Sequence, residues 1–113
     1  MTEGIYKEGI YKNVWEYSIQ QEILTITGYT GTASRIDIPA SIGGVAVKHI
    51  GSQAFLQKYS LMYVAIPEGV ETIGDWAFSF CNNLTSVTLP ASVTSIGGSA
   101  TDRDSQLVLT VVA

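Results

Sequence analysis

The residues best suited to carry chemistry are a single cysteine, Cys81, and a single histidine, His49. A cysteine nucleophile needs a nearby imidazole to take its proton, and these two residues are distant in the chain, so only the fold could bring them together. A single cysteine excludes an internal disulfide, and there is no cysteine cluster that could hold zinc. Two interpretations of Cys81 stay open. It is either a catalytic nucleophile or a small buried hydrophobic residue, and the second is the usual state of a free cysteine.

Composition excludes several other functions. The 113 residues include six Lys or Arg and ten Asp or Glu, for a formal net charge of −4. An acidic chain lacks the basic surface expected of a protein that binds nucleic acid or an anionic membrane. No stretch approaches the roughly 18 apolar residues of a membrane span. Residues 1–4 have neither the basic nor the apolar region of a secretory signal.

Motifs of catalysis are also missing from the sequence. It contains no Gly-rich phosphate loop, no cluster of metal-ligand residue types and no nucleophile and base at a recognisable spacing. We therefore expect no catalytic residue, no metal site and no cofactor, and we predict that the protein is not an enzyme.

The elements that must position any site follow an internal repeat. Residues 73–95 repeat residues 50–72 with a period of 23, sharing Ile, Gly, Ala-Phe, Leu, Val, Pro and Val at matching places. A third copy opens at Ile96 and then degenerates. Periods of about 20–29 residues with a Leu-x-x-Leu-x-Leu core are typical of leucine-rich repeats, which stack one strand and one turn per coil. The predicted fold is mostly β, a short leucine-rich-repeat β-solenoid with an N-terminal β-hairpin cap.

The cap is predicted from residues that precede the repeats. Alternating apolar residues from Trp15 to Ile19 and from Leu24 to Ile26 flank a turn at residues 20–22, a pattern typical of a β-hairpin. Such a hairpin would cover the apolar face and the strand edge of the first coil. We expect residues 28–31, Gly-Tyr-Thr-Gly, to form a turn. The tandem Glu-Gly-Ile-Tyr-Lys of residues 3–12 predicts a loosely ordered arm or an edge strand.

The first coil has five residues more than the others, and we place this excess in a loop insertion at residues 43–47. Insertions in repeat proteins fall on loops, sometimes at the binding face. The expected organisation is an N-terminal arm at 1–14 and a single leucine-rich-repeat domain at 15–113. That domain comprises a hairpin cap at 15–31, repeats at 32–49, 50–72 and 73–95, and a degenerate C-terminal cap at 96–113.

Each coil should have an inward and an outward set of side chains. Val87 and Leu89 are two positions apart in a strand and share one face, whereas Ser86 and Thr88 share the other. Phe78 and its equivalent in the preceding coil should fill the far side of the coil, so we expect Phe78 to be buried. The other positions expected to point inward are Leu61, Val64, Ile66, Val70, Ile73, Leu84, Val93 and Ile96, with Gly74 and Gly97 at tight corners.

Residues 73–95 match the unit Ile-Gly-x-x-Ala-Phe-x-x-Cys-x-x-Leu-x-x-Val-x-Ile-Pro-x-x-Val-x-x at nearly every marked place, Cys81 included. This unit resembles the BspA-like leucine-rich repeats of bacterial and some protozoan surface proteins, and the resemblance covers residues 15–100. It implies a non-enzymatic protein-binding module, with a host or extracellular matrix protein as partner. It also implies a location at the cell surface or in a larger secreted protein; a cytoplasmic location is the alternative.

Two coils depart from the family unit. Lys58 occupies the cysteine place of the second coil, and we expect its side chain to reach water. In the third coil Thr101 replaces the phenylalanine and Asp104 replaces the cysteine, so we expect that coil not to close as a standard repeat. The apolar residues 106–113 then form either a cap or an exposed edge that seeks another strand.

The outward strand positions are the candidate binding residues. One column is predicted to hold Arg35, Tyr63, Ser86 and Leu109, and the other Asp37, Ala65, Thr88 and Val111. Tyrosine and arginine are common interface anchors, so the candidate site comprises Arg35, Asp37, Tyr63, Ser86 and Thr88. The alternative is that these are ordinary solvated residues. In that case the protein would be a structural spacer, or a self-assembly unit that pairs edge to edge.

Overall fold

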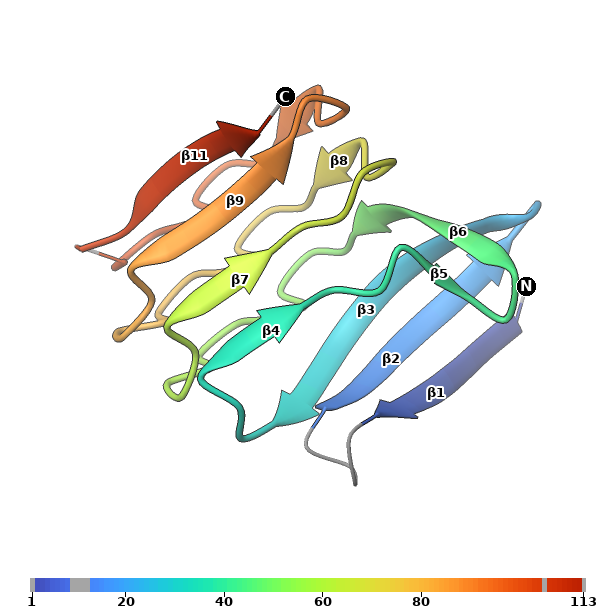
Figure 1. The fold of residues 1–113 in the computed structure, drawn as a ribbon, viewed down its shortest axis with the longest axis horizontal. Helices are drawn as coiled ribbons and strands as arrows, with labels where there is room; N and C mark the ends of the chain where they lie inside the picture. Colours follow the sequence, from blue (N-terminus) through green and yellow to red (C-terminus); the bar gives the residue numbers. More distant parts are fainter. Residues whose placement is uncertain (1, 9–12, 105, 113) are drawn as a thin grey trace.

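The computed structural model describes residues 2–8, 13–104 and 106–112, and it contains strands and turns with no helix among them. No helix that could span a membrane is therefore present in those residues. These described residues form eleven strands (Figure 1). They are β1 (Thr2–Glu8), β2 (Asn13–Gln20), β3 (Ile23–Gly31), β4 (Arg35–Asp37), β5 (Ser41–Ile42), β6 (Val45–Ile50), β7 (Tyr63–Ala65), β8 (Thr72–Ile73), β9 (Ser86–Pro90), β10 (Ser95–Ile96) and β11 (Val108–Val112).

The strands form two sheets. The front sheet is parallel and has the order β4-β7-β9-β11; the back sheet has the order β1-β2-β3-β6-β8-β10, with β5 paired to β6. In each coil a segment of turns connects the back sheet to the front sheet, as residues 51–62 and 74–85 do, and we call this part of the coil the turn side. Its backbone is hydrogen-bonded from coil to coil, as in Phe55 N to Ala77 O at 2.7 Å and Phe78 N to Ala100 O at 2.7 Å. The predicted β-solenoid with a hairpin cap is therefore confirmed.

The cap is the antiparallel pair of β2 and β3, joined by a two-residue turn in which Gln21 and Glu22 have positive φ. Strand β1 adds a further antiparallel strand through residues 2–8, and residues 9–12 of the tandem lie outside the described residues. The turn predicted at residues 28–31 was wrong. Strand β3 continues to Gly31 because a register shift after Glu16 lets it stay paired with β2, which places Tyr29 in the core.

The insertion in the first coil was also predicted wrongly as a loop. Gly43 and Gly44 form a two-residue turn with φ of 58° and 82°, and β5 and β6 pair across it as a hairpin. Glycine suits this turn because positive φ costs it little. Val47, which the prediction placed in the loop, is fully buried.

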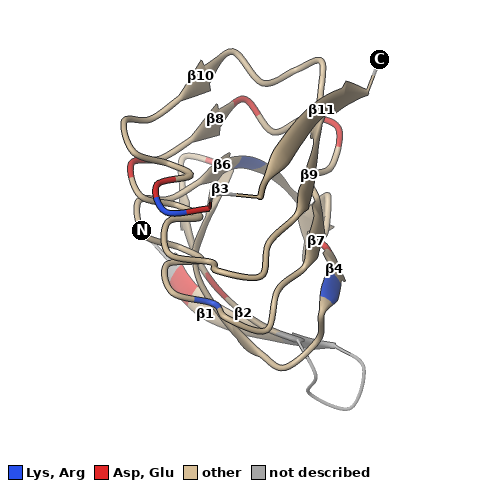
Figure 2. Cartoon of the chain, turned by 90° about the vertical axis from the view of Figure 1, so that its left-hand side faces the viewer, with Lys and Arg blue, Asp and Glu red and all other residues tan. Residues whose placement is uncertain are grey.

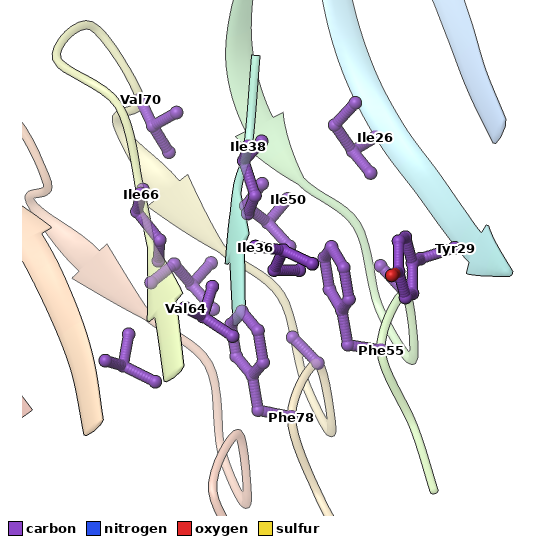
Figure 3. Close-up of a cluster of buried hydrophobic side chains, with 14 of the residues drawn as sticks. Ile26, Tyr29, Ile36, Ile38, Ile50, Phe55, Val64, Ile66, Val70 and Phe78 are labelled. Atoms are coloured by element: carbon purple, nitrogen blue, oxygen red, sulfur yellow. The ribbon is translucent and has the colours of Figure 1, made fainter. Parts of the chain in front are cut away.

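The core holds a ladder of aromatic rings that runs from the cap into the repeats (Figure 3). Trp15 contacts Tyr29 with ring centroids 4.9 Å apart, Tyr29 contacts Phe55 at 5.4 Å, and Phe55 stacks on Phe78 at 4.9 Å. The prediction that Phe78 is buried is confirmed. Since each ring packs on one from the next coil, the ladder joins the cap and the coils into one core.

Two glycines allow a close approach between the backbones of neighbouring coils. A Cβ placed on Gly74 would lie 2.5 Å from Ser52 N, and one placed on Gly97 would lie 2.5 Å from Asp75 N. Neither glycine has a positive φ. The predicted tight corner is therefore not the reason for glycine here. Only glycine leaves room for the backbone of the preceding coil.

The third coil closes, but not as a standard repeat, because β11 pairs with β9 at a spacing of 22 residues and not 23. Trp76 N donates to Gly98 O and Phe80 N to Asp102 O, which continues the ladder of the turn side, and β11 pairs with β9. Thr101 and Asp104 do not prevent this because the ladder uses backbone groups. The Asp104 carboxylate also accepts a hydrogen bond from Cys81 N at 2.9 Å.

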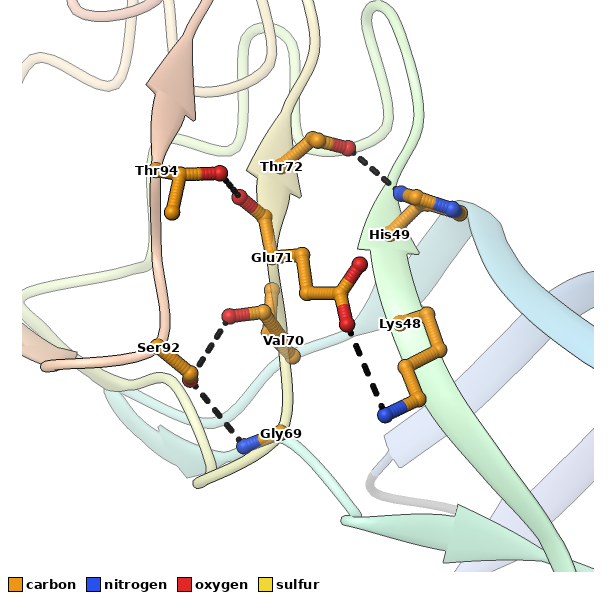
Figure 4. Close-up of polar contacts among 8 residues, drawn as sticks. All are labelled: Lys48, His49, Gly69, Val70, Glu71, Thr72, Ser92 and Thr94. Atoms are coloured by element: carbon orange, nitrogen blue, oxygen red, sulfur yellow. Dashed lines mark hydrogen bonds and ion pairs between the residues drawn. The ribbon is translucent and has the colours of Figure 1, made fainter.

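Short polar side chains tie the coils together at the back sheet and the adjoining corner (Figure 4). The Ser92 hydroxyl donates to Val70 O at 2.8 Å and accepts from Gly69 N at 3.1 Å. His49 Nδ1 lies 2.6 Å from the Thr72 hydroxyl. These contacts satisfy polar groups of one coil with those of the next.

Candidate functional site

The predicted binding residues lie together on the outer face of the front sheet. Arg35, Tyr63 and Ser86 are paired across β4, β7 and β9, so they form one row across the strands. Thr88 lies beside them in the second row. These four residues line a shallow hollow of about 160 Å³ together with Ile36, Val64 and Ala65.

The hollow exists because outward side chains change in size along the row. Tyr63 is 44% exposed and Ser86 is partly exposed next to it. Ala65 and the small hydroxyl side chains of Ser86 and Thr88 line the hollow beside this large ring. Asp37 is exposed and is paired with Ala65, but it does not line the hollow.

The last member of each predicted column was wrong. Val108, not Leu109, is paired with Ser86, and Thr110, not Val111, is paired with Thr88. Leu107 keeps the 23-residue spacing from Leu84. The residue pairs between β11 and β9, however, are 22 positions apart in the sequence, so the register slips by one residue at the start of β11. Leu109 and Val111 therefore lie on the inward side of the front sheet.

Sequence reasoning missed two exposed residues in the segment before β7. Tyr59 is 52% exposed and Met62 is 39% exposed; Met62 directly precedes β7, and Tyr59 lies four residues before the strand. The available signal was that neither residue falls on an inward position of the repeat, although both are large and apolar. They add exposed apolar area to the segment that leads into β7.

The strands of the front sheet carry few charged side chains. Strands β7, β9 and β11 contain no charged residue, and the charges of β4 are Arg35 and Asp37, of opposite sign (Figure 2). A surface of this kind has no strong field to steer a charged ligand.

The catalytic interpretation of Cys81 has no support in the geometry. The thiol is fully buried, and its Sγ donates to Phe55 O at 3.0 Å. Burial raises the pKa of Cys81 to about 11, with the charge of Asp104 adding to the increase and the Lys58 backbone and charge opposing it. His49 bonds instead to Thr72 of the back sheet. Lys58 is partly exposed, as predicted.

We expect Cys81 to resist a thiol reagent in the folded protein at pH 8 and to react promptly once denaturant is added. A thiol with a raised pKa carries little thiolate, and burial denies access to the reagent. The measurement is the rate of labelling with and without denaturant. Rapid labelling of the native protein would place Cys81 outside the core.

A second buried group is the carboxyl of Asp104. Burial raises its pKa to about 6, opposed by the hydrogen bond from Cys81 N and assisted by the charge of Asp102. Its Oδ2 has no hydrogen-bond partner. No group of three His, Cys, Asp or Glu side chains suited to a metal occurs within residues 2–8, 13–104 and 106–112.

The turn side carries an aromatic pair that sequence reasoning also missed. The rings of Trp76 and Phe80 are nearly parallel, with centroids 6.4 Å apart, and the Arg103 guanidinium lies 6.0 Å from the Phe80 centroid. The equivalent positions of the preceding coil are Gln53 and Gln57, which share the positive φ. Because Arg103 belongs to the next coil, part of this cluster serves contact between coils.

Parallel strands stacked at a period of about 23 residues and closed by hydrogen-bonded turns define a leucine-rich-repeat solenoid. Within that class, residues 48–107 match the family described as "BspA type Leucine rich repeat region (6 copies)". The chain belongs to this family, as the resemblance of residues 73–95 implied.

Solved structures agree with this assignment. A leucine rich cell surface protein of Faecalibacterium prausnitzii A2-165 is 32% identical with a TM-score of 0.78, over 98% of this chain and 32% of that one. A leucine-rich-repeat protein of Bacteroides capillosus is 21% identical with a TM-score of 0.65, over 96% of this chain and 99% of that one. The leucine-rich-repeat protein of T. pallidum is 19% identical with a TM-score of 0.57, over 91% of this chain and 70% of that one. Both share the fold. The chain spans about a third of the F. prausnitzii protein. A comparison with curated proteins gave no significant match.

Proposed function

We propose that the protein is a non-enzymatic protein-binding module that uses the outer face of its front sheet. The observation that carries this proposal is Tyr63, a large ring 44% exposed at the edge of a hollow that Arg35 also lines. Tyrosine and arginine are enriched among residues that dominate binding energy. Met62, the residue before Tyr63 in the chain, is also exposed.

A protein partner fits this surface better than a nucleic acid or a membrane. The chain has a net charge of −4, and Arg35 is the one basic residue of the four front-sheet strands. The partner we propose is a host or extracellular matrix protein, which is what the BspA-like family implies. The proposed location is the cell surface or a larger secreted protein, supported by the similar F. prausnitzii cell surface protein.

Replacement of Tyr63 by alanine should weaken binding by about 2 kcal/mol, or about thirtyfold in Kd, because a central anchor ring would be lost. Salt should change the affinity of the wild type little, since the face has no strong net charge. The measurement is calorimetric titration of both proteins against a panel of purified extracellular matrix proteins. Unfolding midpoints would verify that Tyr63→Ala is folded.

The matched control is Trp76→Gln, which removes an exposed ring from the turn side and installs the residue found at the equivalent position, Gln53. It should bind as the wild type does. Equal binding by Tyr63→Ala and the wild type would refute the front-sheet site. The next candidates would then be the β5–β6 hairpin and the ends of the solenoid.

A second candidate function is that of a structural spacer or self-assembly unit of a larger surface protein. One observation favours it. All five residues of β11 are exposed, and four of them are Val or Leu. A strand with these properties at the end of a sheet invites another strand.

A further inference from the structure

Strand β11 ends the front sheet with apolar side chains on both faces. Leu109 is paired with Val87 and Val111 with Leu89, so both continue inward rows of the solenoid. The side chains of Val87 and Leu89 are at most 5% exposed, whereas Leu109 is 45% and Val111 is 67% exposed. The rows that form the core therefore continue one strand beyond the point where they are covered.

The backbone of β11 is also open along its outer edge. Val108 N donates to Thr85 O at 2.9 Å, which directs Val108 toward β9. In a parallel ladder alternate residues direct their N–H and C=O to the same neighbour, so Thr110 and Val112 also face β9. Leu109 and Val111 then direct their N–H and C=O away from β9. Within the described residues no strand pairs with this edge.

A groove adjoins the same end of the molecule. It has a volume of about 370 Å³ and is lined by residues that include Leu89, Pro90, Val93, Ile96 and Val111. Ile96 was predicted to point inward to the core. It is 47% exposed, since no further coil covers it within the described part of the chain, although its counterpart Ile73 is buried.

This end lacks the devices that protect sheet edges elsewhere in the chain. The edge strands at the opposite end of the two sheets carry charges that discourage pairing, Glu3 on β1 and Arg35 and Asp37 on β4. Strand β11 reads Val-Leu-Thr-Val-Val and has no charge, proline or glycine. Exposed apolar edges without such protection pair readily with another strand.

We propose that β11 pairs antiparallel with β11 of a second copy of this chain, about a two-fold axis at Thr110. Leu109 then faces Val111 of the second copy, and Val111 faces Leu109 of the second copy. Their free N–H and C=O groups form four backbone hydrogen bonds. Thr110 faces Thr110 of the second copy as a non-hydrogen-bonded pair. The contact is isologous, as in most homodimers, and closes without forming a fibre.

This register is selected by the strand itself. Thr110 is the middle residue of β11, so pairing about it uses all five residues of each strand. Residues on the same face stay together, because Val108 meets Val112 of the second copy on the outer face and the Leu109 and Val111 rows meet on the inner face. A slip of one residue in the pairing would set inward residues opposite outward ones.

The dimer would present one continuous eight-stranded front sheet. The two Tyr63 side chains would lie on the same face about 28 Å apart, because they are separated by five strand spacings of about 4.8 Å across the sheet and by about four residues, or about 14 Å, along the strands. Such an arrangement would make a binding module bivalent. The dimer itself does not depend on the proposed binding function, and Tyr63→Ala should leave it intact.

Cross-linking tests the register. In oxidising buffer Thr110→Cys should give a disulfide-linked dimer, because Cα atoms of a facing non-hydrogen-bonded pair are about 4.5 Å apart and a disulfide needs about 4.4–6.8 Å. Val112→Cys should give little, since its two copies would be about 14 Å apart at about 3.4 Å per residue. The wild type is the background control because its cysteine is buried. Products are read on non-reducing gels and by mass spectrometry.

Sedimentation measures the association without cross-links. The wild type should show a concentration-dependent dimer. Val111→Lys, an exposed substitution, should raise its dissociation constant about tenfold or more because an ammonium would be buried against leucine. A wild type that stays monomeric up to high concentration would overturn the proposal. So would equal cross-linking of Val112→Cys and Thr110→Cys, or no cross-link from a folded Thr110→Cys.

Discussion

Replacing Phe78 by alanine should lower the free energy of unfolding by about 3–5 kcal/mol. Phe78 is 1% exposed, and its ring stacks on Phe55 with an interplanar angle of 9°. Alanine would leave a cavity in the middle of the aromatic ladder, where backbone hydrogen bonds from coil to coil limit any collapse. A small domain has about 5–15 kcal/mol of stability in total, so this one substitution should remove a large part of it.

Urea and thermal denaturation followed by circular dichroism would measure the effect, with Tyr63→Ala as the control. Tyr63 is exposed on the front sheet, and its truncation should change stability by about 0.5 kcal/mol or less. If Phe78→Ala unfolded within a degree or two of the wild type, the repeat register described above would be wrong.

Gly74→Ala should destabilise the protein by about 2–3 kcal/mol. The added methyl group would meet backbone atoms of the preceding coil, Ser52 N at 2.5 Å and Gly51 C at 2.8 Å. A backbone held in a ladder cannot rotate away as a side chain can, so the two coils must separate locally. Overpacking of a well-packed interior costs about 1–3 kcal/mol, and loss of Gly74 N to Ile50 O, a bond of 2.8 Å, would add to it.

Gly43→Asn provides the matched control. Gly43 has a φ of 58°, and a Cβ there would meet nothing within 4 Å. Asparagine tolerates this backbone conformation better than most residues. We therefore expect a loss below about 1 kcal/mol by thermal and urea unfolding. If Gly74→Ala proved no more harmful than Gly43→Asn, close approach of the coils would not be the reason for glycine at position 74.

The sequence alone determined the class of fold and much of the core. In a solenoid each coil meets the same neighbour surface, so buried positions such as Phe55 and Phe78 recur at the repeat period and can be recognised by comparison. The alignment of Arg35, Tyr63 and Ser86 followed for the same reason. Parallel pairing at the repeat period places equivalent residues side by side.

Only the tertiary structure decided what happens where the repeat is broken. Strand β3 runs through residues 28–31 because pairing with β2 outweighs a local preference of glycines for turns. The slip that turns Leu109 and Val111 inward arises from pairing of β11 with β9, which no local pattern records. Glycine at position 74 is required by the backbone of another coil. Contacts between segments distant in the chain set each of these features, and the repeat pattern describes only contacts that recur.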